Sequence, residues 1–318
     1  MINERIFLWE DETDVYLDTY VLSPSKQIQV GCKHPAVIIC PGGGYLRISD
    51  QEAEAVALRF NANGYHVFVL AYSVGEKTKV PRPLLELGKS MLLVQSRAKE
   101  WMIDTDKIVV CGFSAGGHLC ALLCTQWKTA AKLLDVPEKM MRPAAAVLGY
   151  PCTDVSTQLP SIPLVLFSTG KIDPDHPEDA VLDCFKPAII EENGEKVLNI
   201  GTAMRRFTMG SEQPEPGILA QNSPYLHVTA DTSPTFIWTT CNDDLLPAEN
   251  SAKYVQALME KGVPTEFHMF VDGHHGLSLA DHTTADNESF INPACAKWFD
   301  MAITFLDWLW VKTHKNDG

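Results

Sequence analysis

The sequence predicts an α/β protein whose central sheet is mostly parallel and flanked by helices. Short apolar runs rich in β-branched residues alternate along the chain with longer segments whose apolar residues recur at helical spacing. This alternation is typical of parallel βαβ units that helices cover on both faces. A chain of 318 residues suffices for one large domain of this class with an inserted segment.

Most of the expected sheet lies in the first half of the chain. Residues 5–22 have the pattern of a hairpin, which would extend one edge of the sheet in antiparallel fashion. Apolar runs predict strands at 36–42, 65–73, 107–112 and 144–150. Helical periodicity predicts helices at 49–64, 84–101 and 115–127. The helix at 49–64 opens with Ser49 and Glu52 at the spacing of a capping box.

The second half of the chain completes the predicted core after a long interruption. Strands are expected at 235–241 and 265–271, and helices at 247–262 and 294–313. Residues 152–232 are rich in Pro, Asp, Glu and Gly, yet so long a structureless loop is improbable in a compact domain. We therefore expect residues 1–151 and 233–318 to form the core. Residues 152–232 would form an inserted cap or lid with one or two short helices.

The last predicted helix carries more apolar residues than one buried face requires. They are Trp298, Phe299, Phe305, Trp308 and Trp310. Packing in the core and a homodimer contact would explain them equally well.

Charge and cysteine content restrict the expected partners and compartment. The 26 basic and 40 acidic residues give a net charge of −14, which repels the phosphates of nucleic acids. No apolar run is long enough to cross a bilayer, and the charged stretch "MINERIFLWEDETD" lacks the apolar core of a signal peptide. The nine cysteines are scattered without a C-x-x-C pair. We expect a reduced, cytoplasmic protein that binds neither nucleic acid nor membranes.

The stretch "VVCGFSAGGHLCALLC" places Ser114 at a tight turn between an expected strand and an expected helix. Gly112 and Gly116 lie two positions away on either side, where side chains would collide with neighbouring backbone. A Gly-x-Ser-x-Gly turn in this context is a nucleophile elbow, which projects the serine hydroxyl above the sheet. The same pattern arises by chance in small-residue loops, but the flanking strand and helix favour a nucleophile.

A nucleophilic serine needs a histidine base and an acid that orients the base. In this arrangement the chain order is serine, acid, histidine. His274 and His275 follow the last expected strand, and Asp243 and Asp244 follow the strand before it. Local sequence does not separate the two histidines. Asp244 could instead cap the helix that begins near Pro247, which would leave Asp243 for the histidine.

The loop "CPGGGYLR" after the 36–42 strand is the expected source of oxyanion-hole donors. The backbone N–H of Ala115 and that of Gly43 or Gly44 would bind the oxyanion. A phosphate cradle is the alternative, but the loop lacks both the G-x-G-x-x-G spacing and the lysine of a P-loop. Tyr45 would either line the substrate pocket or pack in the core.

A metal site is a further alternative near the two histidines. Its ligands would come from Asp272, His274, His275, Asp281 and His282. We disfavour it because these residues lack the helical i, i+4 spacing of a zinc-binding histidine pair. His118 and His268 fall within an expected helix and strand and are interpreted as structural.

Taken together, these segments resemble the α/β-hydrolase esterases, and among them the bacterial acetyl-xylan and sugar-ester esterases often labelled "xylanase-like". The matching segments are "PGGGY", "SDQEAEAVA", "GFSAGGHLCA", "SPYLHVTADTSPTFIW", "DDLLPAENSAKYVQAL" and "GHHGL". The resemblance implies Ser114 as nucleophile, Asp243 as the acid before a D-x-x-hydrophobic-Pro run, and His275 as the histidine of Gly-x-His-Gly. Residues 170–220 look longer and more divergent than in similar proteins.

The resemblance implies a serine carboxylesterase that hydrolyses short-chain acyl esters through an acyl-enzyme, with acetyl esters of carbohydrates as the expected substrates. It implies no metal or organic cofactor. A peptidase similar to prolyl oligopeptidase shares the triad, but such enzymes usually carry a large extra domain. An inactive homologue that binds a small molecule is the third hypothesis, which the complete set of candidate residues disfavours.

Overall fold

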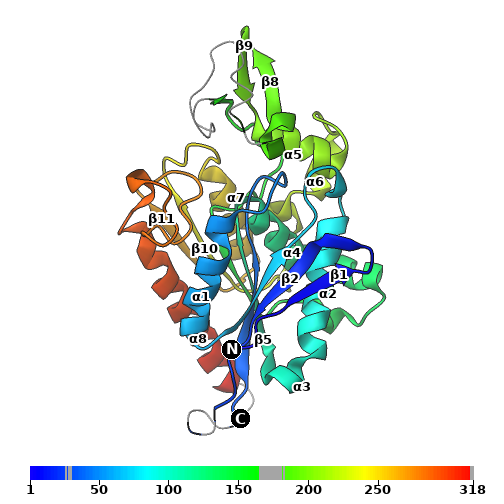
Figure 1. Ribbon diagram of the computed structural model, residues 1–318, viewed down its shortest axis with the longest axis vertical. Coiled ribbons are helices and arrows are strands. Elements are labelled where there is room, and N and C mark those ends of the chain that lie inside the picture. The colour runs from blue at the N-terminus through cyan, green and yellow to red at the C-terminus, as the bar shows by residue number, and fades with distance from the viewer. Residues whose placement is uncertain (26, 28–30, 165–180, 182, 316–318) are drawn as a thin grey trace.

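The computed structural model is built around a mixed sheet of eight strands (Figure 1). The structure describes the chain except residues 26, 28–30, 165–180, 182 and 316–318. The strands of this sheet are β1 (Arg5–Trp9), β2 (Glu12–Tyr20), β3 (His34–Cys40), β4 (His66–Ala71), β5 (Ile103–Phe113), β6 (Ala145–Gly149), β10 (Thr235–Thr240) and β11 (Thr265–Phe270). Their order across the sheet is β1-β2-β4-β3-β5-β6-β10-β11.

The six strands from β4 to β11 in this order pair in parallel, whereas β2 pairs antiparallel with β4, and β1 antiparallel with β2. The amino-terminal hairpin thus extends one edge of the sheet in the predicted sense. Parallel strands end at the same edge of a sheet, so the loops after β3, β5, β10 and β11 gather at one end of the molecule. This topology confirms the predicted fold class.

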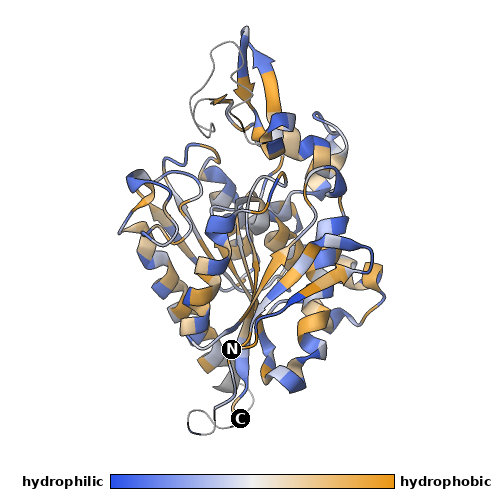
Figure 2. Ribbon diagram, viewed as in Figure 1, coloured by the Kyte–Doolittle hydropathy of each residue, from blue (hydrophilic) through white to orange (hydrophobic). Residues whose placement is uncertain are grey.

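Helices cover both faces of the sheet (Figure 1). They are α1 (Glu54–Ala62), α2 (Arg82–Ser96), α3 (Ala98–Trp101), α4 (Ser114–Leu134), α7 (Glu249–Glu260) and α8 (Trp298–Lys315). Helices α2, α4 and α7 pack on one face, and α1 and α8 pack on the other. Neighbouring strand residues divide between the two faces, so Ile38 joins one apolar core and Ile39 the other. Figure 2 shows the apolar residues concentrated on the sheet and on the helix surfaces that meet it.

The predicted helix at 49–64 begins differently from the expectation. A short 3₁₀ turn covers Asp50–Glu52, and α1 starts only at Glu54. Among the described residues, the hydroxyl of Ser49 makes no capping hydrogen bond, so the predicted capping box is wrong. The side chain of Glu52 turns into the protein instead, where it is 3% exposed.

The described residues between β6 and β10 form a second, smaller sheet beside two helices. The sheet has the order β7-β9-β8, from β7 (Ile162–Pro163), β8 (Ile189–Glu192) and β9 (Glu195–Leu198). The helices are α5 (Ile200–Met209) and α6 (Pro216–Gln221). The two short helices agree with the one or two that the sequence predicts for this segment. Its sequence did not predict the three-stranded sheet. Figure 1 shows β8 and β9 projecting beyond one end of the main sheet.

The last helix places most of its aromatic residues in the core. Trp298, Phe299 and Phe305 are buried, whereas Trp308 is 43% exposed. Trp310 is partly buried against the same core. Core packing therefore accounts for four of the five residues that suggested a dimer contact, and a homodimer stays a prediction. Within the described ranges, no helix combines the length and apolar character that crossing a membrane requires. All nine cysteines lie in these ranges as free thiols.

Candidate active site

Ser114 lies at the sharp turn where β5 ends and α4 begins. Its φ of 50° is in the left-handed region, which is strained for a residue with a side chain. A Cβ atom on Gly116 would lie 1.9 Å from the carbonyl oxygen of Cys40, and one on Gly112 would lie 2.4 Å from the carbonyl oxygen of Gly116. Only glycine therefore allows the turn to pack this closely against the end of β3.

A continuous chain of hydrogen bonds joins Ser114, His275 and Asp243. His275 Nε2 is 2.8 Å from Ser114 Oγ. On the other side of the ring, His275 Nδ1 is 2.8 Å from Asp243 Oδ2 and 3.0 Å from Oδ1. The side chain of Asp243 is 1% exposed and that of His275 is 11% exposed, so the pair is shielded from water. Such an arrangement can remove a proton from the serine hydroxyl as it attacks a carbonyl carbon.

His274 and Asp244 form a second pair beside the first, at the surface. His274 Nδ1 is 2.8 Å from Asp244 Oδ2, and both side chains are about half exposed. Asp244 Oδ1 also accepts the backbone N–H of His275 at 2.9 Å. In the described part of the chain no side chain caps α7, so the alternative role of Asp244 as its cap is wrong. Asp244 instead contacts both histidines of the loop after β11.

The charges around His275 favour its protonated form. Burial lowers the pKa of His275, but the charge of Asp243 and its hydrogen bond raise it, and Glu52 and Asp244 add to this effect. The pKa of His275 therefore lies above the ordinary value of 6.5. Asp243 Oδ1 is held in turn by the backbone N–H groups of Leu245 and Leu246. These two hydrogen bonds hold the carboxylate of Asp243 in place independently of His275.

The glycine-rich loop after β3 lies directly against the nucleophile turn. A Cβ atom on Gly42 would be 3.0 Å from Ser114 Cβ. Gly43 and Gly44 both have positive φ, and in the described part of the chain their N–H groups meet no acceptor. Ala115 is in the first turn of α4, where backbone N–H groups have no partner within the helix. The three predicted oxyanion donors therefore belong to two segments that meet at Ser114.

Tyr45 follows this loop but packs inside the protein. Its side chain is 2% exposed, and its hydroxyl is 2.7 Å from His118 Nδ1. His118 Nε2 is bound in turn to the carbonyl oxygen of Asn222 at 2.8 Å. Both ring nitrogens of His118 are thus engaged within the fold. Tyr45 contributes to the wall of a small cavity together with Thr78 and Leu84.

The candidate metal ligands do not converge. Asp281 pairs with Arg59, and Asp272 accepts a hydrogen bond from Asn242. Across the described residues, no three His, Cys, Asp or Glu side chains come together in a way that could hold a metal ion. His268, on β11, is bound to its neighbour Glu266.

Glu52 also contacts the loops of this site, although its local sequence predicts a helix cap. Its Oε2 accepts the N–H of Gly42 at 2.6 Å, and its Oε1 accepts the hydroxyl of Tyr150 at 2.7 Å. A glutamate three positions after a serine and before an apolar run is also the signature of a capping box. The local pattern carried no signal that could separate these two roles.

Comparison with known proteins agrees with this architecture. The family model described as BD-FAE matches residues 18–258. Endo-1,4-beta-xylanase B of Butyrivibrio fibrisolvens is 26% identical over 281 residues, which cover 86% of this chain. The match covers only 38% of that relative, so the chain spans less than half of its length.

Solved structures match this chain over nearly their whole length. The carboxylesterase Cest-2923 from Lactobacillus plantarum WCFS1 has a TM-score of 0.74 and 27% identity, over 96% of this chain and 97% of that one. An acetyl ester-xyloside bifunctional hydrolase from Caldicellulosiruptor lactoaceticus has a TM-score of 0.64 and 32% identity, over 95% and 97% of the two chains. The chain therefore belongs to the BD-FAE family and has the α/β-hydrolase fold, as the resemblance in its sequence predicts.

Proposed function

We propose that the protein is a serine carboxylesterase in which Ser114, His275 and Asp243 form the catalytic triad. The observation that carries the proposal is the hydrogen-bonded chain from Ser114 Oγ through His275 to the buried carboxylate of Asp243. It begins at a strained turn that presents the hydroxyl beside a glycine-rich loop. The similarity to a carboxylesterase and to an acetyl ester-xyloside hydrolase supports the same reaction class.

The reaction proceeds in two halves. Ser114 Oγ attacks the ester carbonyl carbon while His275 Nε2 takes the hydroxyl proton, and Asp243 stabilises the imidazolium that forms. The tetrahedral intermediate collapses when His275 returns this proton to the leaving alcohol, so the acyl group stays on Ser114. Water, activated by His275 in the same way, then releases the acid and regenerates the serine.

The negative charge on the intermediate needs donors that are already in place. The N–H groups of Gly43, Gly44 and Ala115 are proposed to bind this oxyanion. Each such donor typically contributes about 3–4 kcal/mol of transition-state stabilisation in a preorganised site. No metal or organic cofactor is needed for these steps.

Short acyl esters are the proposed substrates, with acetyl groups on carbohydrates as the natural class. A Cβ atom on Gly44 would lie 2.7 Å from Ile200 Cγ2, so α5 leaves little room beside this part of the loop. A small acyl group fits such a restriction. The carbohydrate is suggested by the similarity to a xylanase and to an acetyl ester-xyloside hydrolase.

Residues 152–232 are proposed to act as the cap over this site. Leu198 and Ile200 from this segment share an apolar cluster with Leu46, which follows the glycine-rich loop. Differences in this segment would then change the alcohol or acyl group that the enzyme accepts. The nine free thiols favour a reducing compartment such as the cytoplasm.

An activity panel tests the proposal. We expect the purified protein to hydrolyse p-nitrophenyl acetate and acetylated xylo-oligosaccharides and to react with a fluorophosphonate probe, and we expect Ser114→Ala to do neither. Faster turnover of a prolyl p-nitroanilide than of any ester would favour a peptidase. No turnover of any substrate and no probe labelling would indicate an inactive binding protein.

A further inference from the structure

Glu52 is a buried carboxylate at the point where three loops of the site meet. It is 3% exposed, although an isolated carboxylate is costly to bury. Gly42 N–H in the glycine-rich loop is 2.6 Å from Oε2, and the hydroxyl of Tyr150, which follows β6, is 2.7 Å from Oε1. Neither contact belongs to the helix that Glu52 precedes. The side chain thus serves the loops around Ser114 rather than the start of α1.

The hydrogen bonds around Glu52 suit an ionised carboxylate. Tyr150 Oη accepts the backbone N–H of Ser278 at 2.9 Å, so its own proton is free to point at Glu52. Both oxygens of Glu52 therefore receive a donor, one from Tyr150 and one from Gly42. Burial raises the pKa of Glu52 above its ordinary value of 4.5, and the hydrogen bonds from Tyr150 and Gly42 offset only part of that shift. A carboxylate with a donor on each oxygen needs no further proton of its own.

The Tyr150 contact extends to the candidate base. The ring of Tyr150 packs edge to face on His275, with ring centres 4.9 Å apart and planes at 65°. Ser278, which donates to Tyr150, is in the same loop as His275. Ser278 Oγ also donates to the carbonyl oxygen of Gln51, next to Glu52. The position of His275 is therefore connected to Glu52 by several short contacts.

The Gly42 contact extends to the candidate oxyanion donors. Gly42 immediately precedes Gly43 and Gly44, whose N–H groups face the site in the proposed mechanism. A Cβ atom on Gly42 would lie 2.7 Å from Glu52 Oε2 and 3.0 Å from Ser114 Cβ, so the carboxylate, the loop and the nucleophile are in close contact. Without the hydrogen bond from Gly42 N–H to Glu52, the backbone of Gly42, the first glycine of the loop, would no longer be held in this position.

We propose that Glu52 is a positioning residue, whose carboxylate joins the oxyanion loop at Gly42 to the histidine loop at Tyr150 and so sets the distance between the oxyanion donors and His275. The inference rests on the proposed esterase function. It extends the site beyond the three residues of the triad and the oxyanion donors. An error of about 1 Å in such a distance can cost about 100-fold in rate.

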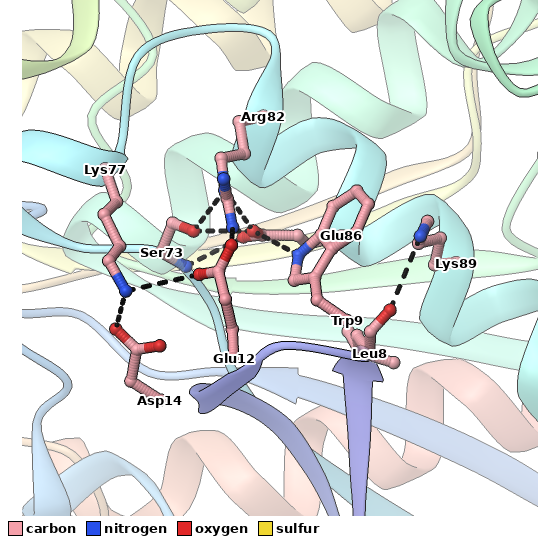
Figure 3. A network of polar contacts seen from close by, with 9 residues as sticks. All are labelled: Leu8, Trp9, Glu12, Asp14, Ser73, Lys77, Arg82, Glu86 and Lys89. Atoms are coloured by element: carbon pink, nitrogen blue, oxygen red, sulfur yellow. Dashed lines mark hydrogen bonds and ion pairs between the residues drawn. The ribbon is translucent and has the colours of Figure 1, made fainter.

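Glu86 offers a matched control for Glu52. It is also a fully buried glutamate, and it accepts the backbone N–H of Ser73 at 2.8 Å (Figure 3). Its other donors are the hydroxyl of Ser73, the indole of Trp9 and the guanidinium of Arg82. These contacts tie the amino-terminal hairpin to α2, and none of these partners is a residue of the candidate site. Glu86→Gln therefore reports what loss of a buried carboxylate does to stability alone.

The central measurement compares Glu52→Gln with Glu86→Gln. The amide introduced by Glu52→Gln can accept from only one of the two donors and faces the other with an NH₂ group. We expect kcat for p-nitrophenyl acetate to fall about 10- to 100-fold in Glu52→Gln, with KM changed less than about threefold. Labelling of Ser114 by a fluorophosphonate should slow in parallel. Glu86→Gln should lower Tm but keep kcat within about twofold of the wild type.

A second variant keeps the test decisive if Glu52→Gln does not fold. Tyr150→Phe retains the ring on His275 and the Gly42 bond, and removes the hydroxyl with its two hydrogen bonds, one to Glu52 and one from the N–H of Ser278 in the histidine loop. We expect a smaller fall in kcat than in Glu52→Gln. In the double variant the loss should be less than the product of the single losses, because both substitutions break the same connection.

The outcomes separate this inference from the proposed function. Wild-type hydrolysis that is lost in Ser114→Ala, together with normal kcat in folded Glu52→Gln, would overturn the role of Glu52 alone. Normal kcat in Tyr150→Phe would overturn it equally when Glu52→Gln is unfolded, as would fully multiplicative losses in the double variant. A wild-type protein without ester hydrolysis would overturn the proposed function, and the inference with it.

Discussion

His275 Nε2 lies 2.8 Å from Ser114 Oγ, although 161 positions separate the two residues in the chain. The contact exists because β5 and β11 run in the same direction within one sheet and end at the same edge. Ser114 directly follows β5, and His275 lies in the loop that follows β11. A hydrogen bond at this place is chemically useful because the serine sits at a strained turn beside the candidate oxyanion donors.

Replacement of Ser114 by alanine should abolish ester hydrolysis while the protein folds normally. The hydroxyl is the proposed nucleophile, and in other serine triads its loss costs about 10⁶-fold in kcat. Steady-state assays with p-nitrophenyl acetate, alongside circular dichroism, check this prediction. A folded Ser114→Ala variant with more than a few per cent of wild-type activity would contradict the role of Ser114.

Substitution of His275 should lower activity far more than substitution of His274. His275→Ala removes the group that contacts Ser114 Oγ and should lose nearly all activity. His274→Ala removes a half-exposed side chain bound to Asp244 and should retain most of it. Parallel kcat measurements on the two purified variants decide the matter. The opposite ranking would mean that the histidine loop adopts another arrangement during turnover.

Substitution of Asp243 should lower kcat far more than substitution of Asp244. Asp243→Asn removes the buried acid that holds His275 Nδ1, and we expect kcat to fall by about 10⁴-fold, as in other serine triads. Asp244→Asn keeps an oxygen that can accept the N–H of His275, so its effect should be under about tenfold. The prediction fails if Asp244→Asn is the more damaging change.

The pH dependence of kcat/KM follows from the environment of His275. The imidazole must be neutral to accept the proton of Ser114, so activity is lost as the pH falls below its pKa. Because Asp243 raises that pKa above 6.5, the acidic limb of the profile should have its midpoint above pH 6.5. In Asp243→Asn burial remains while this charge is lost, so the midpoint of the residual activity should move to lower pH. Profiles of kcat/KM against pH for the wild type and this variant measure both midpoints.

Gly116 should be intolerant of even a methyl group. A Cβ atom there would lie 1.9 Å from the carbonyl oxygen of Cys40, and backbone cannot move aside easily. We expect Gly116→Ala to lose stability at the upper end of the roughly 1–3 kcal/mol typical of overpacking, or more. Gly217→Ala is the matched control, because a Cβ atom on Gly217 meets nothing within 4 Å among the described residues. Thermal unfolding of both variants provides the comparison, and equal Tm values would contradict the packing argument.

Local sequence patterns accounted for most of the fold. The alternation of apolar strands and amphipathic helices follows from periodicities of two and 3.6 residues, which each segment carries by itself. The elbow at Ser114 was predictable for the same reason, because the glycines that it requires are only two positions away. The three-stranded sheet β7-β9-β8 was not, because its strands have two to four residues and little periodicity to detect.

The sequence by itself determined the fold class and the candidate nucleophile, because strands, helices and the Gly-x-Ser-x-Gly turn are local patterns. It also placed the candidate acids and histidines, because each pair directly follows an expected strand. Local sequence left Asp243 and Asp244, and His274 and His275, interchangeable, and only a resemblance favoured one of each. The tertiary structure distinguishes them by their surroundings, since it pairs Asp243 with His275 in the interior and Asp244 with His274 at the surface. It also shows that Glu52, which was expected to cap a helix, is buried and accepts hydrogen bonds from Gly42 and Tyr150. These two partners come together only because β3 and β6 belong to the same sheet.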